Sequence, residues 1–491
     1  MEYMLEAALQ GLVMTVRPEV MLYVAFGVFL GLIFGVIPGL NGPIALALFT
    51  PLTYRMDPAS AMAFLLATYG AVSYGGSISA ILIGVPGTGE NVATCFDGYE
   101  MTKKGEAGRA LAASATASGL GAIVGVIVLI ALLPVLRGIV LAFGPPEVLM
   151  ISLWGLTALA ALGGSIQRGL ISGGIGLLLA MVGFEPVTGS LRYALGTLYL
   201  YDGINLTAAL IGLFAVTESI SLMSKGGSIA KTDISSIGSV AQGIKDVFIH
   251  WFLFVRCSII GLIVGIMPGV GGAVGNIIAY SHALQTTKGN YGTGDVRGVI
   301  APESSVNSKE GGDLIPTIAF GVPGAASMAI LLNAFYLHGL NPGKELLTTK
   351  LNYTFLMAFT LLAGNILSSL IGLSFARLVS KIALVRASIL APTILVFAFL
   401  GSYGVSGRIG DVAVTFLCGL LGLWLKKYDY VRAAVVIGLV LGEIIERSYH
   451  LSIQTFGWSF LSRPLTLAML ALTVITILIP ILFGKEKETE A

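Results

Sequence analysis

Charged residues are scarce in this chain. Only 11% of its 491 residues are Asp, Glu, Lys or Arg, whereas soluble domains carry about 25%. Hydrophobic residues make up 56%, and the mean hydropathy is +0.91. Because so few charges cannot cover a water-facing surface, the composition excludes a soluble globular protein. The net charge of only +2 gives no indication of a polyanionic partner such as nucleic acid.

Residues that hold metals or carry out redox chemistry are few as well. The three cysteines and four histidines have neither metal-ligand nor redox spacing. No arrangement of Ser, His and Asp indicates hydrolysis, and neither GVPG sequence (residues 84–87 and 321–324) continues into the GKS or GKT of a P-loop. We therefore expect a protein that is not an enzyme and has no structural metal or cofactor. An intramembrane enzyme stays an alternative that turnover of a lipid or peptide would support.

Long apolar runs without interruption are also few, because glycine and proline divide them. Counting apolar segments of about 18–25 residues gives roughly 11–14 membrane elements, several of them short or re-entrant. Glycine is abundant, at 64 residues, and small residues let membrane helices approach closely. The ladder of Gly27, Gly31 and Gly35, echoed by Gly261 and Gly265, is typical of such packing. The sequence predicts a dense multi-helix bundle.

Two similar stretches with a helix-breaking Pro-Gly pair occur 230 residues apart, counted from Pro38 to Pro268. Residues 31–43 read GLIFGVIPGLNGP, and residues 261–273 read GLIVGIMPGVGGA. A second matched pair follows, SISAILIGVPG at residues 77–87 and LIPTIAFGVPG at residues 314–324. Apolar segments interrupted by Gly and Pro in corresponding halves indicate a transporter binding site.

These duplications divide the chain into a first repeat half, 1–223, a polar linker, 224–246, and a second repeat half, 247–491. We expect an all-α integral membrane protein, a polytopic helical bundle of two homologous repeats with broken or re-entrant helices. An odd number of spans between the repeats would insert them with opposite topology, and we favour this inverted arrangement.

The first Pro-Gly break has a definite chemical consequence. Pro38 removes a backbone donor and Gly39 accepts left-handed geometry, so the helix should stop there. The freed backbone groups need partners that lipid cannot supply. Asn41 adds a side-chain amide, and a new helix starting near Pro43 would direct its N-terminal dipole at the break, which favours an anion. A plain kink with a conformational role is the alternative interpretation.

The segments around both GVPG sequences are rich in hydroxyls, amides and backbone N–H groups, which suit carboxylate oxygens. Acidic residues in apolar context are candidates for cation or proton coupling. A channel would use the same breaks as a filter, but it needs an open aqueous path. The predicted ion-coupling residues are Glu303, Asn41 and Asn276. The predicted substrate-binding residues are Pro38, Gly39, Asn41, Ser77, Gly87, Thr88, Asn91, Pro268, Gly269, Gly271, Asn276, Ser304, Asn307, Gly324 and Ser327.

Five stretches together identify a family resemblance. They are GVIPGLNGP (35–43), YGGSISAILIGVPGT (74–88), DGYEMTKKGEAGRAL (97–111), VIAPESSVNSKEGGDLIPTIAFGVPG (299–324) and LGEIIERS (441–448). In this order they resemble the large membrane subunit of the bacterial tripartite tricarboxylate transporters, the TctA-type family. The likeness covers nearly the whole chain. We expect Asp97 and the basic residues that follow it to form a solvated cytoplasmic loop.

The resemblance implies a multi-pass protein of the bacterial inner membrane. Such proteins take up tri- or dicarboxylates such as citrate by ion symport, with Na⁺ or H⁺ as the coupling ion and no ATPase. They work with a small membrane subunit (TctB-type) and a periplasmic solute-binding protein (TctC-type). Family members often have an Asn- and Ala-rich stretch where this chain has Ser304, Ser305 and Val306, which leaves the acid open. We expect alternating access, as an elevator, with substrate at the paired Pro-Gly breaks.

Overall fold

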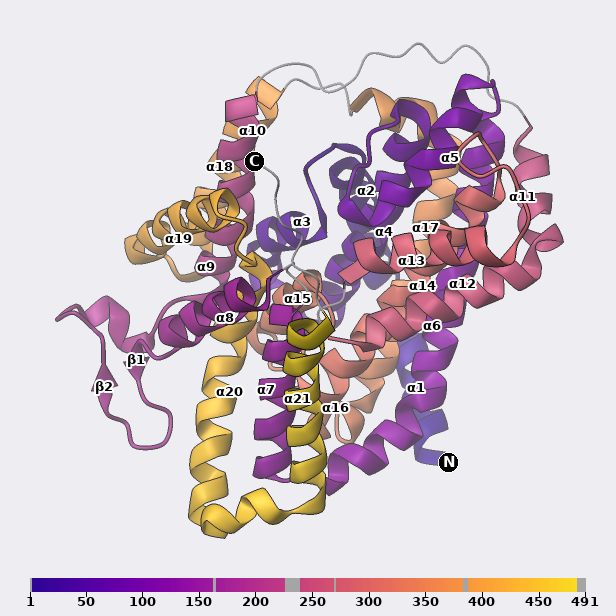
Figure 1. The fold of residues 1–491 in the computed structure, drawn as a ribbon. Helices are drawn as coiled ribbons and strands as arrows, with labels where there is room; N and C mark the ends of the chain where they lie inside the picture. The colour runs from indigo at the N-terminus through magenta and orange to yellow at the C-terminus, as the bar shows by residue number, and fades with distance from the viewer. Residues whose placement is uncertain (1, 162–164, 226–238, 269–270, 383–386, 484–491) are drawn as a thin grey trace. The chain divides into compact units, whose positions relative to one another are not determined.

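The computed structural model describes residues 2–161, 165–225, 239–268, 271–382 and 387–483 (Figure 1). The described chain is helical almost throughout. Its contacts define two compact units, residues 1–138 with 207–420 and residues 139–206 with 421–491. Each unit draws on both predicted halves. Most of the predicted linker, 226–238, lies outside the described residues, and its last part is helical, since α11 begins at Val240.

The larger unit contains most of the helices. In chain order they are α1 (Glu2–Thr15), α2 (Pro18–Val36), α3 (Gly42–Phe49), η1 (Thr50–Arg55), α4 (Pro58–Ile83), η2 (Gly89–Asn91), α5 (Val92–Lys103), most of α6 (Ala107–Ala142), α9 (Leu206–Ile211), the π-helical η4 (Gly212–Val216), α10 (Thr217–Lys225), α11 (Val240–Ile249), α12 (Trp251–Ile266), α13 (Gly271–Thr286), α14 (Arg297–Phe320), α15 (Ala326–Leu337), α16 (Lys344–Leu347), α17 (Leu351–Ile382), α18 (Ala387–Ser406) and the first part of α19 (Ile409–Lys427).

The smaller unit holds the described strands. Its helices are α7 (Pro145–Ala161), α8 (Ile166–Ala180), η3 (Leu198–Asp202), α20 (Arg432–Phe456), η5 (Gly457–Ser462) and α21 (Pro464–Phe483). The two-residue strands β1 (Gly183–Phe184) and β2 (Leu191–Arg192) pair antiparallel, with Gly183 opposite Arg192. Figure 1 shows α7, α20 and α21 side by side, in agreement with their contacts.

Seven of the described helices are long and apolar enough to cross a membrane: α2, α4, α6, α9 with α10, α17, α18 and α19. Two bent pairs, α11 with α12 and α20 with α21, raise the number to nine if each pair is one span. The apolar helices α8 and α15 are shorter. The predicted class, a helical membrane protein, is confirmed. The full spans are fewer than the 11–14 expected elements because that number included short and broken pieces.

The four predicted helix breaks are present, and local sequence explains them. The chain leaves α2 at Val36 and enters α3 at Gly42, with Asn41 as its N-cap. Both GVPG sequences end a helix in the same way, since α4 stops at Gly84 with φ 71° and α14 stops at Gly321 with φ 66°. This left-handed geometry is the usual glycine C-cap, and the proline two residues later prevents the helix from continuing.

The two copies also pack alike. A side-chain carbon on Gly35 of α2 would lie 2.2 Å from the carbonyl oxygen of Val72 in α4, and one on Gly265 of α12 would lie 2.3 Å from that of Lys309 in α14. In both copies, therefore, a glycine lets the backbone of the helix before the Pro-Gly break contact the backbone of the helix that ends at GVPG. The second helices form the centre of the unit, because all residues from 59 to 83 and from 298 to 319 are buried. The inverted orientation of the repeats stays a prediction.

Candidate functional site

One cavity of about 220 Å³ lies in the larger unit, and all four helix breaks contribute to its wall. The wall contains residues that directly follow the first Pro-Gly break, the first GVPG, the second Pro-Gly break and the second GVPG. The remaining lining residues come from α4. The complete set of lining residues is Asn41, Gly42, Pro43, Tyr69, Val72, Ser73, Thr88, Gly89, Glu90, Gly272, Ala273, Ala325, Ala326 and Ser327. Segments more than 200 residues apart in sequence therefore meet at one site.

Four helices begin at this cavity. They are α3 at Gly42, η2 continuing into α5 at Gly89, α13 at Gly271 and α15 at Ala326. The Asn41 side chain accepts from the Ile44 N–H at 3.3 Å, whereas α15 has no side-chain cap among the described residues. Helix N-termini carry partial positive charge and free N–H donors, so their convergence favours an anion in the cavity.

Behind this wall lies a buried ion-pair cluster on α14. The Nζ of Lys309 lies 2.6 Å from Oε1 of Glu90 and 3.3 Å from Oδ2 of Asp313. The Tyr69 hydroxyl donates to the same Asp313 oxygen at 2.6 Å. The Lys309 and Asp313 side chains are each 1% exposed, and that of Glu90 is 23% exposed. Glu90 thus joins the cavity surface to a lysine that does not reach it.

A second polar group surrounds Glu310, which is fully buried. Its two carboxylate oxygens accept from Ser73 Oγ at 2.7 Å and from Asn365 Nδ2 at 2.8 Å. Asn307 donates to the Asn365 side-chain oxygen. The Asn307 Oδ1 atom is itself buried and has no hydrogen-bond partner among the described residues. This unpaired buried oxygen gives the group spare capacity for a proton donor or a cation.

Glu303, also fully buried, is held by hydroxyls alone. Thr94 donates to one carboxylate oxygen at 2.5 Å. Three serines donate to the other, and they are Ser77 at 2.7 Å, Ser114 at 2.8 Å and Ser118 at 3.1 Å. The hydroxyl groups that donate to Glu303 therefore all belong to neutral side chains, and no ion pair to Glu303 occurs among the described residues.

The structure brings only some of the predicted site residues to the cavity. Asn41, Thr88 and Ser327 line it, and Gly271 begins a helix whose next residue lines it. Gly269 lies outside the described residues. The other predicted residues do not line the cavity; they are Pro38, Gly39, Ser77, Gly87, Asn91, Pro268, Asn276, Ser304, Asn307 and Gly324.

Several of these residues have structural partners instead. The Asn91 side chain donates to the Ser77 hydroxyl at 2.8 Å and to the Ser73 carbonyl at 3.1 Å. Asn276 accepts from the Ala93 N–H at 2.8 Å, and Ser304 donates to the carbonyl of its own helix at Ile300. Such contacts order the helices around the cavity. A direct role in binding substrate is a proposal for the residues that line it.

Sequence reasoning missed Lys309, Glu310 and Asp313, which the structure places in the centre of the unit. The sequence does contain a signal for them. Charged residues within apolar segments are candidates for functional sites, and Lys309 and Asp313 are four residues apart, which places them on one face of a helix. The expectation for Asp97 was wrong. It is buried and accepts from the N–H groups of Gly294 and Asp295, so it anchors the loop before α14.

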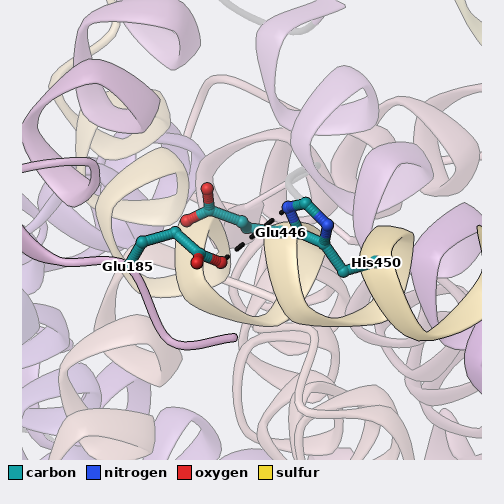
Figure 2. A group of neighbouring side chains, drawn as sticks. All are labelled: Glu185, Glu446 and His450. Atoms are coloured by element: carbon teal, nitrogen blue, oxygen red, sulfur yellow. Dashed lines mark ion pairs between the residues drawn. The ribbon is translucent and has the colours of Figure 1, made fainter. Parts of the chain in front are cut away.

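A separate acidic cluster lies in the smaller unit. Figure 2 shows the side chains of Glu185, Glu446 and His450 near one another. One possible ligand atom from each lies within 4.8 Å of the others. However, both Glu446 oxygens accept from the Arg192 guanidinium, at 2.6 and 2.9 Å. The Glu185 oxygens accept from backbone N–H groups of the β1–β2 hairpin. An ion pair that fastens this hairpin to α20 accounts for the arrangement.

One relative from Agrobacterium vitis, described as an uncharacterized 52.8 kDa protein in the TAR-I ttuC' 3'region, is 29% identical over 472 residues, which cover 93% of this chain and 92% of the relative. Another, described as an uncharacterized protein in the TAR-II ttuC' 3'region of the same organism, is 26% identical over 227 residues, covering 45% of this chain and 94% of the relative. No solved structure matches. The profile of one transporter family matches residues 21–437, and the chain therefore belongs to the tripartite tricarboxylate transporter TctA family.

Proposed function

We propose that the chain is the large transmembrane subunit of a binding-protein-dependent secondary transporter, which takes up tri- or dicarboxylates across the bacterial inner membrane by cation symport. The observation that carries this proposal is the convergence of all four duplicated breaks on one cavity. A small membrane subunit and a periplasmic binding protein are the partners that membership of a tripartite family supports.

In this proposal the substrate carboxylates bind at the converging helix N-termini. Backbone N–H groups in the first turns of α3, α13 and α15 supply donors, and Ser73, Thr88 and Ser327 add hydroxyls. The volume of about 220 Å³ is below the roughly 300 Å³ at which pockets for drug-sized ligands begin, so it suits a small organic acid. The hydroxyls and N–H groups would replace the water lost by the substrate.

The symport part of the proposal rests on charge balance. The unit buries the carboxylates of Glu303, Glu310 and Asp313, and Glu90 lines the cavity. Among the described residues Lys309 forms ion pairs with two of these four carboxylates, Glu90 and Asp313. Burying unpaired carboxylates is costly, and an anionic substrate adds to the imbalance. Protons or Na⁺ ions bound at Glu303 and Glu310 would restore neutrality. Substrate and cation would then stabilise each other in the loaded carrier.

Uptake into proteoliposomes tests this function. The vesicles contain this chain with its small membrane subunit, and binding protein is added outside with labelled citrate or malate. We expect uptake that requires the binding protein and a Na⁺ or H⁺ gradient. Uptake that neither gradient drives would contradict symport, and current that does not saturate with substrate would indicate a channel.

A variant pair at Asn41 tests the site. Asn41→Ala removes both the lining amide and the N-cap of α3, so we expect at least a tenfold loss of uptake, with a stability loss of about 1 kcal/mol. Asn41→Ser keeps a capping oxygen and serves as the control. Uptake by Asn41→Ser that equals wild type would reduce Asn41 to a helix cap, and unchanged uptake by Asn41→Ala would remove it from the site altogether.

A further inference from the structure

The carboxylate of Glu90 occupies a position made for an anion. It lines the cavity, and its Oε1 lies 2.6 Å from the Lys309 ammonium. It also packs against the first turn of α13, because a side-chain carbon on Gly272 would lie 2.4 Å from the Glu90 carboxyl carbon. The buried cation and the helix N-terminus therefore meet at a carboxylate that the protein itself supplies.

Glu90 also separates Lys309 from the cavity. The lysine side chain is 1% exposed and does not line the cavity, whereas Glu90 does. The other groups near the ammonium are the buried Asp313 carboxylate at 3.3 Å and the ring of Tyr69, an α4 residue, at 5.9 Å. Of the two ion-pair partners of Lys309, Glu90 is the one that lines the cavity, so a carboxylate arriving from the cavity meets the ammonium at the Glu90 side.

The duplicated architecture provides a comparison for this ion pair. Aligning Pro86 with Pro323 places Ser327 at the position of Glu90 and Val72 at the position of Lys309. Both of these residues line the same cavity. The second version of the same structural element is thus built with a small hydroxyl and an apolar side chain. The charged pair exists in one version only, which indicates a functional role.

We propose that Glu90 is an internal carboxylate ligand that occupies Lys309 while the cavity is empty, and that a carboxylate group of the substrate displaces it. The proposal rests on the proposed function for the nature of the substrate. The exchange replaces one carboxylate by another, so Lys309 stays paired in the empty and in the loaded carrier. Leaving the buried ammonium partly unpaired would otherwise oppose movement of the empty carrier.

Chemical rescue by acetate tests the exchange. Glu90→Ala removes the internal carboxylate, and acetate is a free carboxylate of the size that was removed. We expect acetate to raise the thermal unfolding midpoint of the detergent-purified full-length Glu90→Ala chain, in a saturable manner and by about 2 °C or more. Wild type should show no such effect, because Glu90 already fills the position. Acetamide, the neutral analogue, should not replace acetate.

Glu345→Ala is the matched control, because Glu345 is a partly exposed carboxylate 2.6 Å from a lysine, Lys350, and does not line the cavity. An equal effect of acetate on Glu345→Ala and Glu90→Ala, or an equal effect of acetamide, would overturn the proposal. If Glu90→Ala does not fold, Glu90→Gln carries the test, since removing an internal competitor should lower the half-saturating citrate concentration by about tenfold or more. An unchanged or higher value would refute the exchange.

The outcomes for the two proposals are separate. Acetate rescue without citrate or malate uptake by wild type would keep Lys309 as a carboxylate site and reject the transport function for those acids. Uptake by wild type without acetate rescue, and without tighter citrate binding in Glu90→Gln, would keep the transporter and reject the role of Glu90.

Discussion

Gly35 offers the sharpest test of how this fold positions its site. It lies in α2, and a side-chain carbon there would stand 2.2 Å from the Val72 carbonyl oxygen and 2.9 Å from Gly75 Cα. Both neighbours are backbone atoms of α4, so no side chain can rotate away. For ordinary contact the first distance must lengthen to about 3.4 Å, which requires the two helices to move apart.

The expected size of the effect follows from two opposing terms. Overpacking a tightly packed contact costs about 1–3 kcal/mol, and replacing a helical glycine by alanine returns up to about 1 kcal/mol through helix propensity. We expect Gly35→Ala to lower the unfolding free energy by about 1–2 kcal/mol. Uptake should fall further, because the carbonyl of Gly35 also faces Gly87 in the first GVPG segment.

Gly138 provides the matched control. It is also inside a helix, α6, but a side-chain carbon there would meet no atom of the described residues within 4 Å. Gly138→Ala should therefore be neutral or slightly stabilising. The measurement is the thermal unfolding midpoint of both variants in the same detergent, with uptake measured in parallel. Equal midpoints for the two variants would refute the close-packing argument, whatever the uptake.

The remaining predictions concern ion pairs outside the cavity. Arg463→Met leaves the fully buried Glu147, 2.8 Å away, without its cation, so we expect a loss of about 3–5 kcal/mol in unfolding experiments; the exposed Arg168 is the control, and a similar loss for Arg168→Met would contradict the argument. Burial raises the pKa of Asp295, but hydrogen bonds and charge from Arg297 outweigh it and hold the pKa below its ordinary value of 3.8. The ionised Asp295 therefore stabilises the fold at neutral pH, and this stabilisation is lost as the pH falls through the lowered pKa. The stability difference between wild type and Asp295→Asn should shrink below about pH 4, and a difference that stays constant with pH would contradict this prediction.

The breaks could be predicted from the sequence because their causes are local. Pro38 lacks an N–H wherever it stands, and Gly84 and Gly321 end their helices in left-handed geometry that few other residues adopt. The glycine ladder likewise indicated close helix contacts. The duplication indicated that the breaks act together, because matched interruptions in two halves point to a shared site.

The partner of each polar side chain could not be predicted in this way. Asn91 and Asn276 looked equivalent to Asn41 in sequence, yet they hydrogen-bond within the helix packing while Asn41 faces the cavity. Asp97 looked like part of a solvated loop, and it is buried. Whether a polar residue faces a neighbour or a cavity depends on chain segments that are distant in sequence.

The membrane class, the family resemblance and the positions of the helix breaks could therefore be predicted from the residues alone, since composition and backbone chemistry act at each residue separately. The folded chain was needed to show that four breaks surround one cavity and that Glu90 of the first half pairs with Lys309 of the second. That pairing depends on geometry in three dimensions, because a buried charge needs a partner within a few ångströms and the chain supplies it from 219 residues away.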